Sequence, residues 1–186
     1  MVSVGRVSAR SAWWALFILY TGLIYSTLGV LPAMWNKFNA FLGSRAVILT
    51  YTAYCIAAAY AFRYIYAIKK ERSPAKYLLF SLFTGALFLM AKFGVTAAEK
   101  IHVAEYGLSG IILYNALKID FDRFGNKLYI YGALLCLATG ALDESMQGFL
   151  PNRYFDWWDI FLNGASGTIL LLLIRFNILK KPDEPR

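Results

Sequence analysis

The chain has 186 residues, of which 59% are hydrophobic and only 16% are charged. A soluble domain carries about 25% charged residues, so long apolar runs separated by short charged gaps indicate membrane spans. The net charge of +8 does not indicate nucleic-acid binding, because the basic residues lie between the apolar runs, where they report membrane orientation.

Six stretches of the chain are apolar over close to the roughly 20 residues that a membrane span requires. They cover residues 11–30, 46–68, 77–93, 101–119, 128–150 and 159–179. The short gaps between them predict that consecutive spans pack as antiparallel neighbours. We therefore expect an all-α fold, a polytopic transmembrane helix bundle of about six spans that forms a single domain over residues 1–186.

Arg6 and Arg10 precede the first span in the manner of a signal peptide. The apolar stretch is longer than the h-region of a signal peptide, and no clear small-residue cleavage motif follows it, so we expect an uncleaved anchor. Cys55 and Cys136 both lie inside apolar runs and outside any metal-ligand spacing. This placement favours buried structural thiols.

The basic residues are distributed unevenly between the two sides of the predicted bundle. With a cytoplasmic N-terminus, fourteen of the nineteen fall on the cytoplasmic side. Among them is the run 69–72, which is also suited to contact with anionic lipid. Five remain outside: Lys37, Arg45, Lys92, Lys100 and Arg153. The positive-inside rule therefore predicts that both termini are cytoplasmic.

Six of the eleven acidic residues fall on the opposite, outer side of the predicted bundle. Ionisable groups in or near a span are costly and are therefore functional candidates. These acids are Glu99, Glu105, Asp143, Glu144, Asp156 and Asp159.

The first polar segment begins the fourth span. On a helix Glu99, His102 and Tyr106 share one face at i, i+3 and i+7, and Glu105 lies three residues from His102 on an adjoining face. His102 is the only histidine in the chain. A neighbouring carboxylate would favour its charged form, and such a pair suits general acid–base catalysis.

The second polar segment joins the fifth and sixth spans. Asp143 and Glu144 lie four and three residues before Gln147, so all three side chains sit near one face of the fifth span. The sixth span also begins with one polar face, formed by Asp156, Asp159, Asn163 and Gly167. Arg153 lies in the loop between the spans, where it could hold a phosphate or carboxylate.

Gly164 and Gly167 would let a neighbouring helix approach the sixth span closely. We therefore expect spans four, five and six to meet near the outer surface and to bring the polar residues together. A structural alternative is that the polar groups are hydrogen-bonded glue within the bundle, with His102–Glu105 and Arg153–Asp159 as pairs. A divalent cation could bridge a bound phosphate, although one histidine among carboxylates is a weak ligand signature.

The same residues resemble the VanZ-like family of bacterial membrane proteins. The family pattern falls within about residues 92–173, on Lys100, His102, Tyr106, Asp143, Glu144, Gln147, Arg153, Asp159 and Asn163. Glu99 is a mild departure, because Asp is common at that position of the family. The resemblance implies a multi-pass protein of the bacterial cytoplasmic (inner) membrane. The family is linked to low-level teicoplanin resistance and has no settled biochemical activity.

Our leading hypothesis is an outward-facing site that binds or processes a lipid-linked or phosphorylated component of the cell envelope. His102, Glu144 and Asp143 would carry acid–base chemistry. Substrate would be held by Lys100, Glu105, Tyr106, Gln147, Arg153, Asp159 and Asn163. We expect no resident metal or other cofactor and no nucleic-acid partner, and we expect contacts with membrane lipid. The alternatives are a non-catalytic accessory subunit of a membrane complex and a small transporter or proton relay.

Overall fold

The computed structural model describes residues 4–93, 97–120, 125–151 and 153–177. In these ranges the chain forms seven α-helices, two short turns of other helix types and no strand. The elements are α1 (Val4–Thr27), α2 (Leu31–Leu42), α3 (Arg45–Arg63), η1 (Tyr64–Ile68), α4 (Pro74–Phe93), α5 (Ala97–Leu117), η2 (Lys118–Asp120), α7 (Lys127–Gln147) and α8 (Trp157–Asn177). The prediction of an all-α fold is confirmed.

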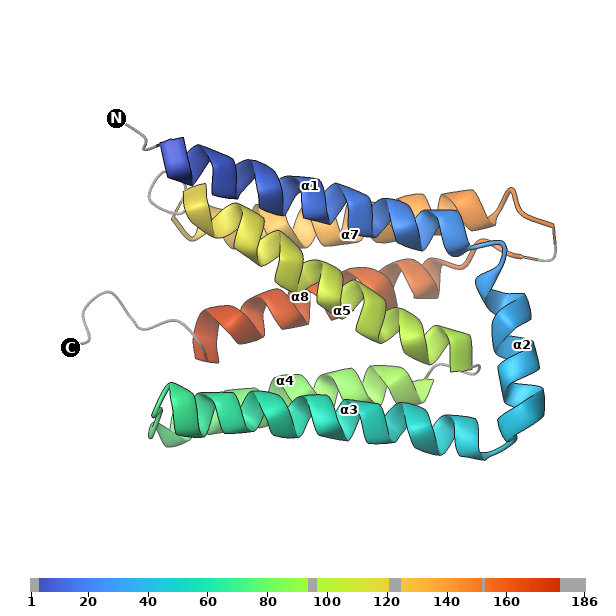
Figure 1. Cartoon of the computed structure of the whole chain (residues 1–186), viewed down its shortest axis with the longest axis horizontal. Coiled ribbons are helices and arrows are strands. Elements are labelled where there is room, and N and C mark those ends of the chain that lie inside the picture. The colour runs from blue at the N-terminus through green and yellow to red at the C-terminus, as the bar shows by residue number, and fades with distance from the viewer. Residues whose placement is uncertain (1–3, 94–96, 121–124, 152, 178–186) are drawn as a thin grey trace.

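Every α-helix except α2 is 19 to 24 residues long, and these long helices run back and forth along one common direction (Figure 1). By length and apolarity, three could each cross a membrane: α3 continued by η1, α4 and α8. The bent pair formed by α1 and α2 could supply a fourth crossing. The helices α5 and α7, which carry most of the predicted polar residues, are not among them.

Helix α2 was not predicted from the sequence. The chain bends by 68° between Ala9–Thr27 and Leu31–Leu42, and α2 then lies across one end of the bundle (Figure 1). Pro32 in its first turn fits a helix start, because proline lacks the N–H that would be unpaired there. Apolar Leu31, Met34 and Phe38 follow helical spacing, and this is the signal that could have revealed the element.

The helix α8 runs through the centre of the bundle and packs against α5, α7 and α4. Glycines allow the closest approaches: a Cβ built on Gly110 of α5 would lie 2.1 Å from the Gly167 carbonyl oxygen of α8. A Cβ on Gly164 would lie 2.4 Å from the Leu137 side chain of α7. The predicted close packing at Gly164 and Gly167 is therefore confirmed.

The hairpin of α3 and α4 is much less covered than α8. Only 6% of the apolar window of α3–η1 and 11% of that of α4 are buried inside the protein, against 44% for α8. Apolar side chains therefore cover the outside of the hairpin, as a lipid environment requires. Cys136 is buried on α7 as expected, whereas Cys55 is exposed on α3, because its helix has little protein around it.

Candidate functional site

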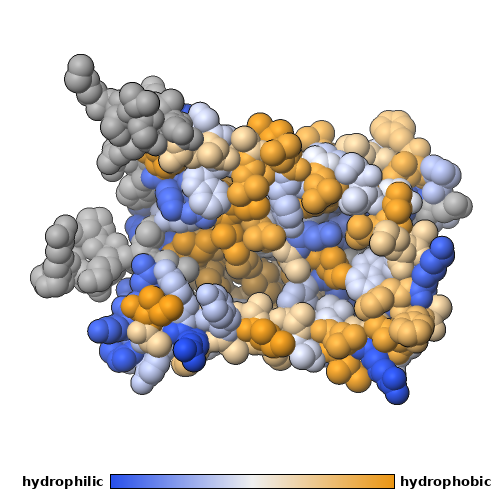
Figure 2. All heavy atoms as spheres, in the orientation of Figure 1, coloured by the Kyte–Doolittle hydropathy of each residue, from blue (hydrophilic) through white to orange (hydrophobic). Residues whose placement is uncertain are grey.

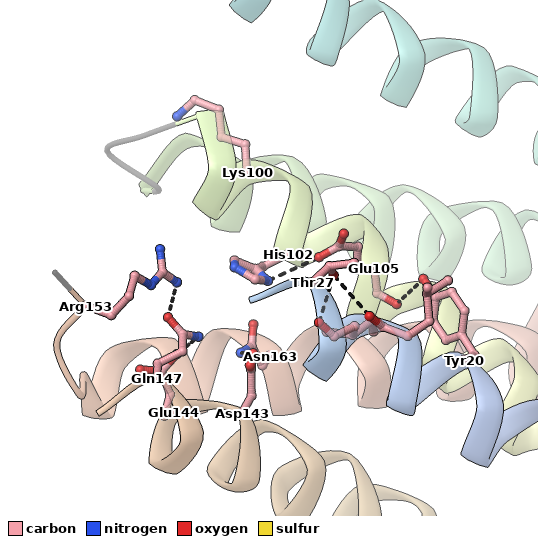
Figure 3. Close-up of polar contacts among 12 residues, drawn as sticks. Tyr20, Thr27, Lys100, His102, Glu105, Asp143, Glu144, Gln147, Arg153 and Asn163 are labelled. Atoms are coloured by element: carbon pink, nitrogen blue, oxygen red, sulfur yellow. Dashed lines mark hydrogen bonds and ion pairs between the residues drawn. The ribbon is translucent and has the colours of Figure 1, made fainter. Parts of the chain in front are cut away.

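The polar residues of α5, α7 and α8 gather at the end of the bundle that α2 crosses. The first half of α5, the last turns of α7 and the first turns of α8 all reach this end (Figure 1). The close α5–α8 and α7–α8 contacts hold the three helix faces toward one another. The side chains that meet here are His102, Glu105, Asp143, Glu144, Gln147, Arg153 and Asn163 (Figure 3), together with Tyr106.

A chain of hydrogen bonds links α7 to the loop that precedes α8. The Gln147 amide Nε2 donates to Glu144 Oε1 at 2.8 Å, and the Arg153 guanidinium donates to Gln147 Oε1 (Figure 3). The backbone N–H of Asp156 donates to Glu144 Oε2 at 3.0 Å. Glu144 thus holds the loop with Oε2 and the Gln147 amide with Oε1, and Gln147 orients the guanidinium of Arg153.

A second group of polar atoms lies deeper, between α5, α7 and α8. Asn163 Nδ2 donates to Asp143 Oδ2 at 3.3 Å, and the Tyr106 hydroxyl lies close enough to Asp143 to interact with it electrostatically. All three side chains are buried. Among the described residues, neither Asp143 Oδ1 nor the Tyr106 hydroxyl has a hydrogen bond of good geometry. Buried polar atoms are normally satisfied, so a proton, a water molecule or a substrate atom could complete this network.

The only histidine forms an ion-pair contact within α5. His102 Nδ1 lies 3.2 Å from Glu105 Oε2, and both side chains are partly exposed. His102 also interacts electrostatically with Asp143, Glu144 and Arg153. The pairing of His102 with Glu105 is the one anticipated from their i, i+3 spacing. The carboxylate paired with the imidazole is therefore that of Glu105, whereas Glu144, the predicted acid–base partner, is engaged by Gln147 and the loop.

The corner between α1 and α2 covers this pair. A small cavity of about 10 Å³ separates the corner from His102, Glu105 and Arg153. Its remaining walls are mostly apolar: Ile24, Thr27, Leu28, Leu31 and Pro32. His102, Glu105 and Arg153 therefore line one small space beneath a largely hydrophobic cover, with room for about one water molecule.

Two tyrosines of α1 tie the cover to the site. The Tyr25 hydroxyl donates to the Thr139 carbonyl of α7 at 2.7 Å, and the Tyr20 hydroxyl donates to the Glu105 carbonyl of α5 at 3.1 Å (Figure 3 for Tyr20). Neither tyrosine was predicted from the sequence as a site residue. No local pattern could have revealed them, since their partners lie 85 and 114 residues further along the chain.

Lys100, Asp159 and Asp156 stand apart from the main contacts. Lys100 is buried, but its side chain points away from His102 and Arg153 (Figure 3). This follows from helix geometry, because residues two apart point to nearly opposite sides. Asp159 interacts electrostatically with Glu144 from the first turn of α8. Asp156 lies before the helix instead of on its polar face, and its Oδ1 accepts the Trp158 N–H at 2.7 Å as an N-cap.

Some predicted features lie outside the described part of the structure, among them the side chains of Arg6 and Glu99 and the basic residues after position 177. Among the described residues, no group of three or more histidine, cysteine or acidic side chains is arranged to hold a metal ion. A cation recruited by a bound phosphate stays a prediction.

Comparison of the chain with known protein families, with curated proteins and with solved structures found no match. The VanZ-like assignment therefore rests on the residues themselves. Chemically, the site combines a fixed guanidinium for an anion, a His–Glu pair for proton transfer and buried acids behind them.

Proposed function

We propose that the protein is a VanZ-like, multi-pass protein of the bacterial cytoplasmic membrane that binds or processes a lipid-linked or phosphorylated envelope component. The site would be the polar cluster at the α2 end of the bundle, facing outward. One observation carries the proposal: Arg153 is held by Gln147 at the same small cavity that His102 and Glu105 line. Arg153 would therefore present a fixed cation, and His102 with Glu105 a titratable pair, to an anionic group that reaches this end of the bundle.

A six-span topology with both termini in the cytoplasm accounts for the arrangement of the helices. The long helices alternate in direction, and α1 begins at the same end of the bundle where α8 finishes (Figure 1). The basic segment between η1 and α4 also lies at that end. Positive charge on this side fits the positive-inside rule.

Within the proposed site, Arg153 would bind the phosphate, because a guanidinium offers paired donors to an anionic group. His102 would give or take a proton at the bound group, and Glu105 would hold and charge the imidazole. Glu144 and Gln147 would position Arg153, and Asn163 and Tyr106 would support Asp143 behind it. Lys100 would contact the substrate only from the other face of α5.

The function can be tested by resistance to teicoplanin and other envelope-directed antibiotics in a susceptible host. The variants Arg153→Ala, His102→Gln and Glu105→Gln would be compared with wild type at matched membrane levels. Lys92→Ala is the control, since it removes an exposed cation from the last turn of α4. We expect wild type and the control to protect and the three site variants to lose protection.

Protection that survives all three site changes would contradict the proposed site. Loss of the protein from the membrane in each variant would instead show that the cluster only holds the helices together. That result would favour the alternative of an accessory subunit of a membrane complex. Arg153→Lys separates charge from geometry, because lysine keeps the charge without the paired donors. Partial protection by this variant is the expected result.

Orientation can be tested separately with single cysteines in a background lacking Cys55 and Cys136. Tyr154→Cys places a thiol in the exposed loop beside the site, and Lys70→Cys places one in the basic loop at the other end. A membrane-impermeant thiol reagent added to intact cells should label the first and not the second. The reverse labelling would place the site in the cytoplasm and overturn its proposed contact with the envelope.

A further inference from the structure

A long groove separates the α3–α4 hairpin from α5 and α8. It consists of two adjoining hollows with volumes of about 390 and 520 Å³. Both are lined by Tyr60 and Ala61 of α3, Ile111 of α5 and Leu173 of α8, so they form one continuous space. Figure 2 shows the hollow across the middle of this face, bordered by apolar atoms.

The polarity of the groove changes along its length. The inner hollow is lined almost wholly by apolar and small side chains such as Ala57, Leu87, Gly107 and Leu170. The other hollow opens at the basic end of the bundle and includes two lysines. Its polar lining consists of Tyr60, Tyr64, Lys69, Tyr114, Asn115 and Lys118, without an acidic side chain among the described lining residues.

The two lysines approach the groove from opposite walls. Lys69 directly follows η1, and its Nζ lies 5.7 Å from the centre of the Tyr64 ring. Lys118 Nζ lies 5.9 Å from the centre of the Tyr114 ring and donates to Asn115 Oδ1 at 2.6 Å. Aromatic rings attract such cations, so both ammonium groups are held near the mouth of the groove.

We propose that the groove binds one anionic phospholipid of the bilayer, with its phosphate at Lys69 and Lys118 and an acyl chain along α3. Basic pockets between membrane helices recognise acidic headgroups in this way. From Tyr54 to Lys69 the groove follows α3 and η1 for roughly 22 Å at 1.5 Å per residue. That length is enough for one leaflet of a hydrocarbon core about 30 Å thick.

The mixed lining favours a lipid over a helix of another protein. A transmembrane helix would fill the apolar part but would offer the two lysines an anion only where it carries an acidic residue at that depth, whereas every anionic phospholipid satisfies both parts of the groove. The lysine-lined mouth lies at the opposite end of the bundle from Arg153 and His102, neither of which lines the groove (Figures 1 and 3). It therefore does not depend on the function proposed for the polar cluster.

The test is native mass spectrometry of the purified full-length protein titrated with phosphatidylglycerol or with phosphatidylcholine of identical acyl chains. We expect one phosphatidylglycerol to bind preferentially. The double change Lys69→Gln with Lys118→Gln should weaken that binding roughly 30-fold, since two cations near the phosphate are lost. Lys37→Gln with Lys92→Gln is the matched control, because both lysines are exposed at the other end, and it should leave the binding unchanged.

The apolar part is tested by Ala61→Trp, which fills the groove at the point where its two hollows join. Ala59→Trp is the control, since Ala59 is exposed on α3 and lines neither hollow. We expect only Ala61→Trp to abolish lipid binding, with both variants eluting as folded protein. Equal binding of the two lipids, no effect of the lysine changes, or occupation by a second copy of the chain would overturn the proposal. If Ala61→Trp does not fold, the lysine variants alone decide.

Discussion

The two halves of the bundle are built in different ways. In the half formed by α5, α7 and α8, glycines bring helix backbones into contact, and buried polar side chains satisfy one another. In the α3–α4 hairpin almost no side chain of α3 is buried, and contacts with the rest include aromatic rings such as the stacked Phe83 of α4 and Phe176 of α8. Polar chemistry thus occupies the tightly packed half, where Asp143, Glu144, Gln147 and Asn163 are buried.

This difference has a physical cause. Within a bilayer, packing and hydrogen bonding hold helices together in place of the hydrophobic effect. A helix pair in backbone contact can fix carboxylates and amides at hydrogen-bond distance, as Asp143 and Asn163 illustrate. A loosely packed hairpin cannot do so, but it leaves a groove open to lipid. The two proposed sites therefore follow from the two modes of packing.

The strongest test of the comparison is Gly110→Ala in the tight half. Its methyl group would lie 2.1 Å from the Gly167 carbonyl oxygen, so α5 and α8 would have to separate. We expect a loss of about 3 kcal/mol or more in the free energy of unfolding, measured by denaturant titration in detergent. In the hairpin, Gly85→Ala meets nothing within 4 Å and should be neutral or slightly stabilising. Equal losses of unfolding free energy in Gly110→Ala and Gly85→Ala would contradict the difference in packing between the two halves.

A smaller effect is expected from Asn163→Ala. The change removes the amide that donates to buried Asp143 Oδ2, and an unsatisfied buried acceptor costs about 1–3 kcal/mol. Ser145→Ala is the control on α7, since this exposed hydroxyl donates only within its own helix, to the Ala141 carbonyl. The control should shift the thermal midpoint little. If Asn163→Ala also leaves the thermal midpoint almost unchanged, the hydrogen bond from Asn163 to Asp143 does not contribute to stability as expected.

The N-cap of α8 is expected to contribute less to stability than the hydrogen bond from Asn163. Asp156→Ala removes the side-chain acceptor for the Trp158 N–H, which should cost about 1 kcal/mol of unfolding free energy. Asp156→Asn keeps an oxygen in place and should restore most of the loss. Should Asn be as harmful as Ala, the charge of Asp156 and not the cap would be the important property.

The smallest effect is expected in the loop of the hairpin, at Glu71. The Lys76 ammonium and the Ser73 and Arg72 N–H groups lower the pKa of the Glu71 carboxyl below its usual value. The stabilisation is therefore complete above the ordinary carboxyl pKa and is lost as the pH falls through the lowered pKa. Glu71→Gln should cost less than about 1 kcal/mol at neutral pH and nothing in strong acid. A stability difference between wild type and Glu71→Gln that grows as the pH falls would contradict this prediction.

The sequence by itself predicted the all-α fold and the gathering of polar residues on single helix faces. Both are local properties: apolar length and a spacing of three or four residues determine which side of a helix is polar. The i, i+3 pair of His102 and Glu105 and the close-packing glycines of α8 could be predicted for the same reason. The spacing of Lys100 from His102 could also have placed it on another face, but the family pattern led us to group the two.

Only the tertiary structure decided which faces meet. Tyr25 reaches Thr139 across 114 residues, and the groove exists because α3 stands away from α5 at Ala61 and Ile111. Periodicity determines the direction in which a side chain points from its own helix. What it meets there depends on how closely two backbones can approach, and contacts distant in sequence determine that distance.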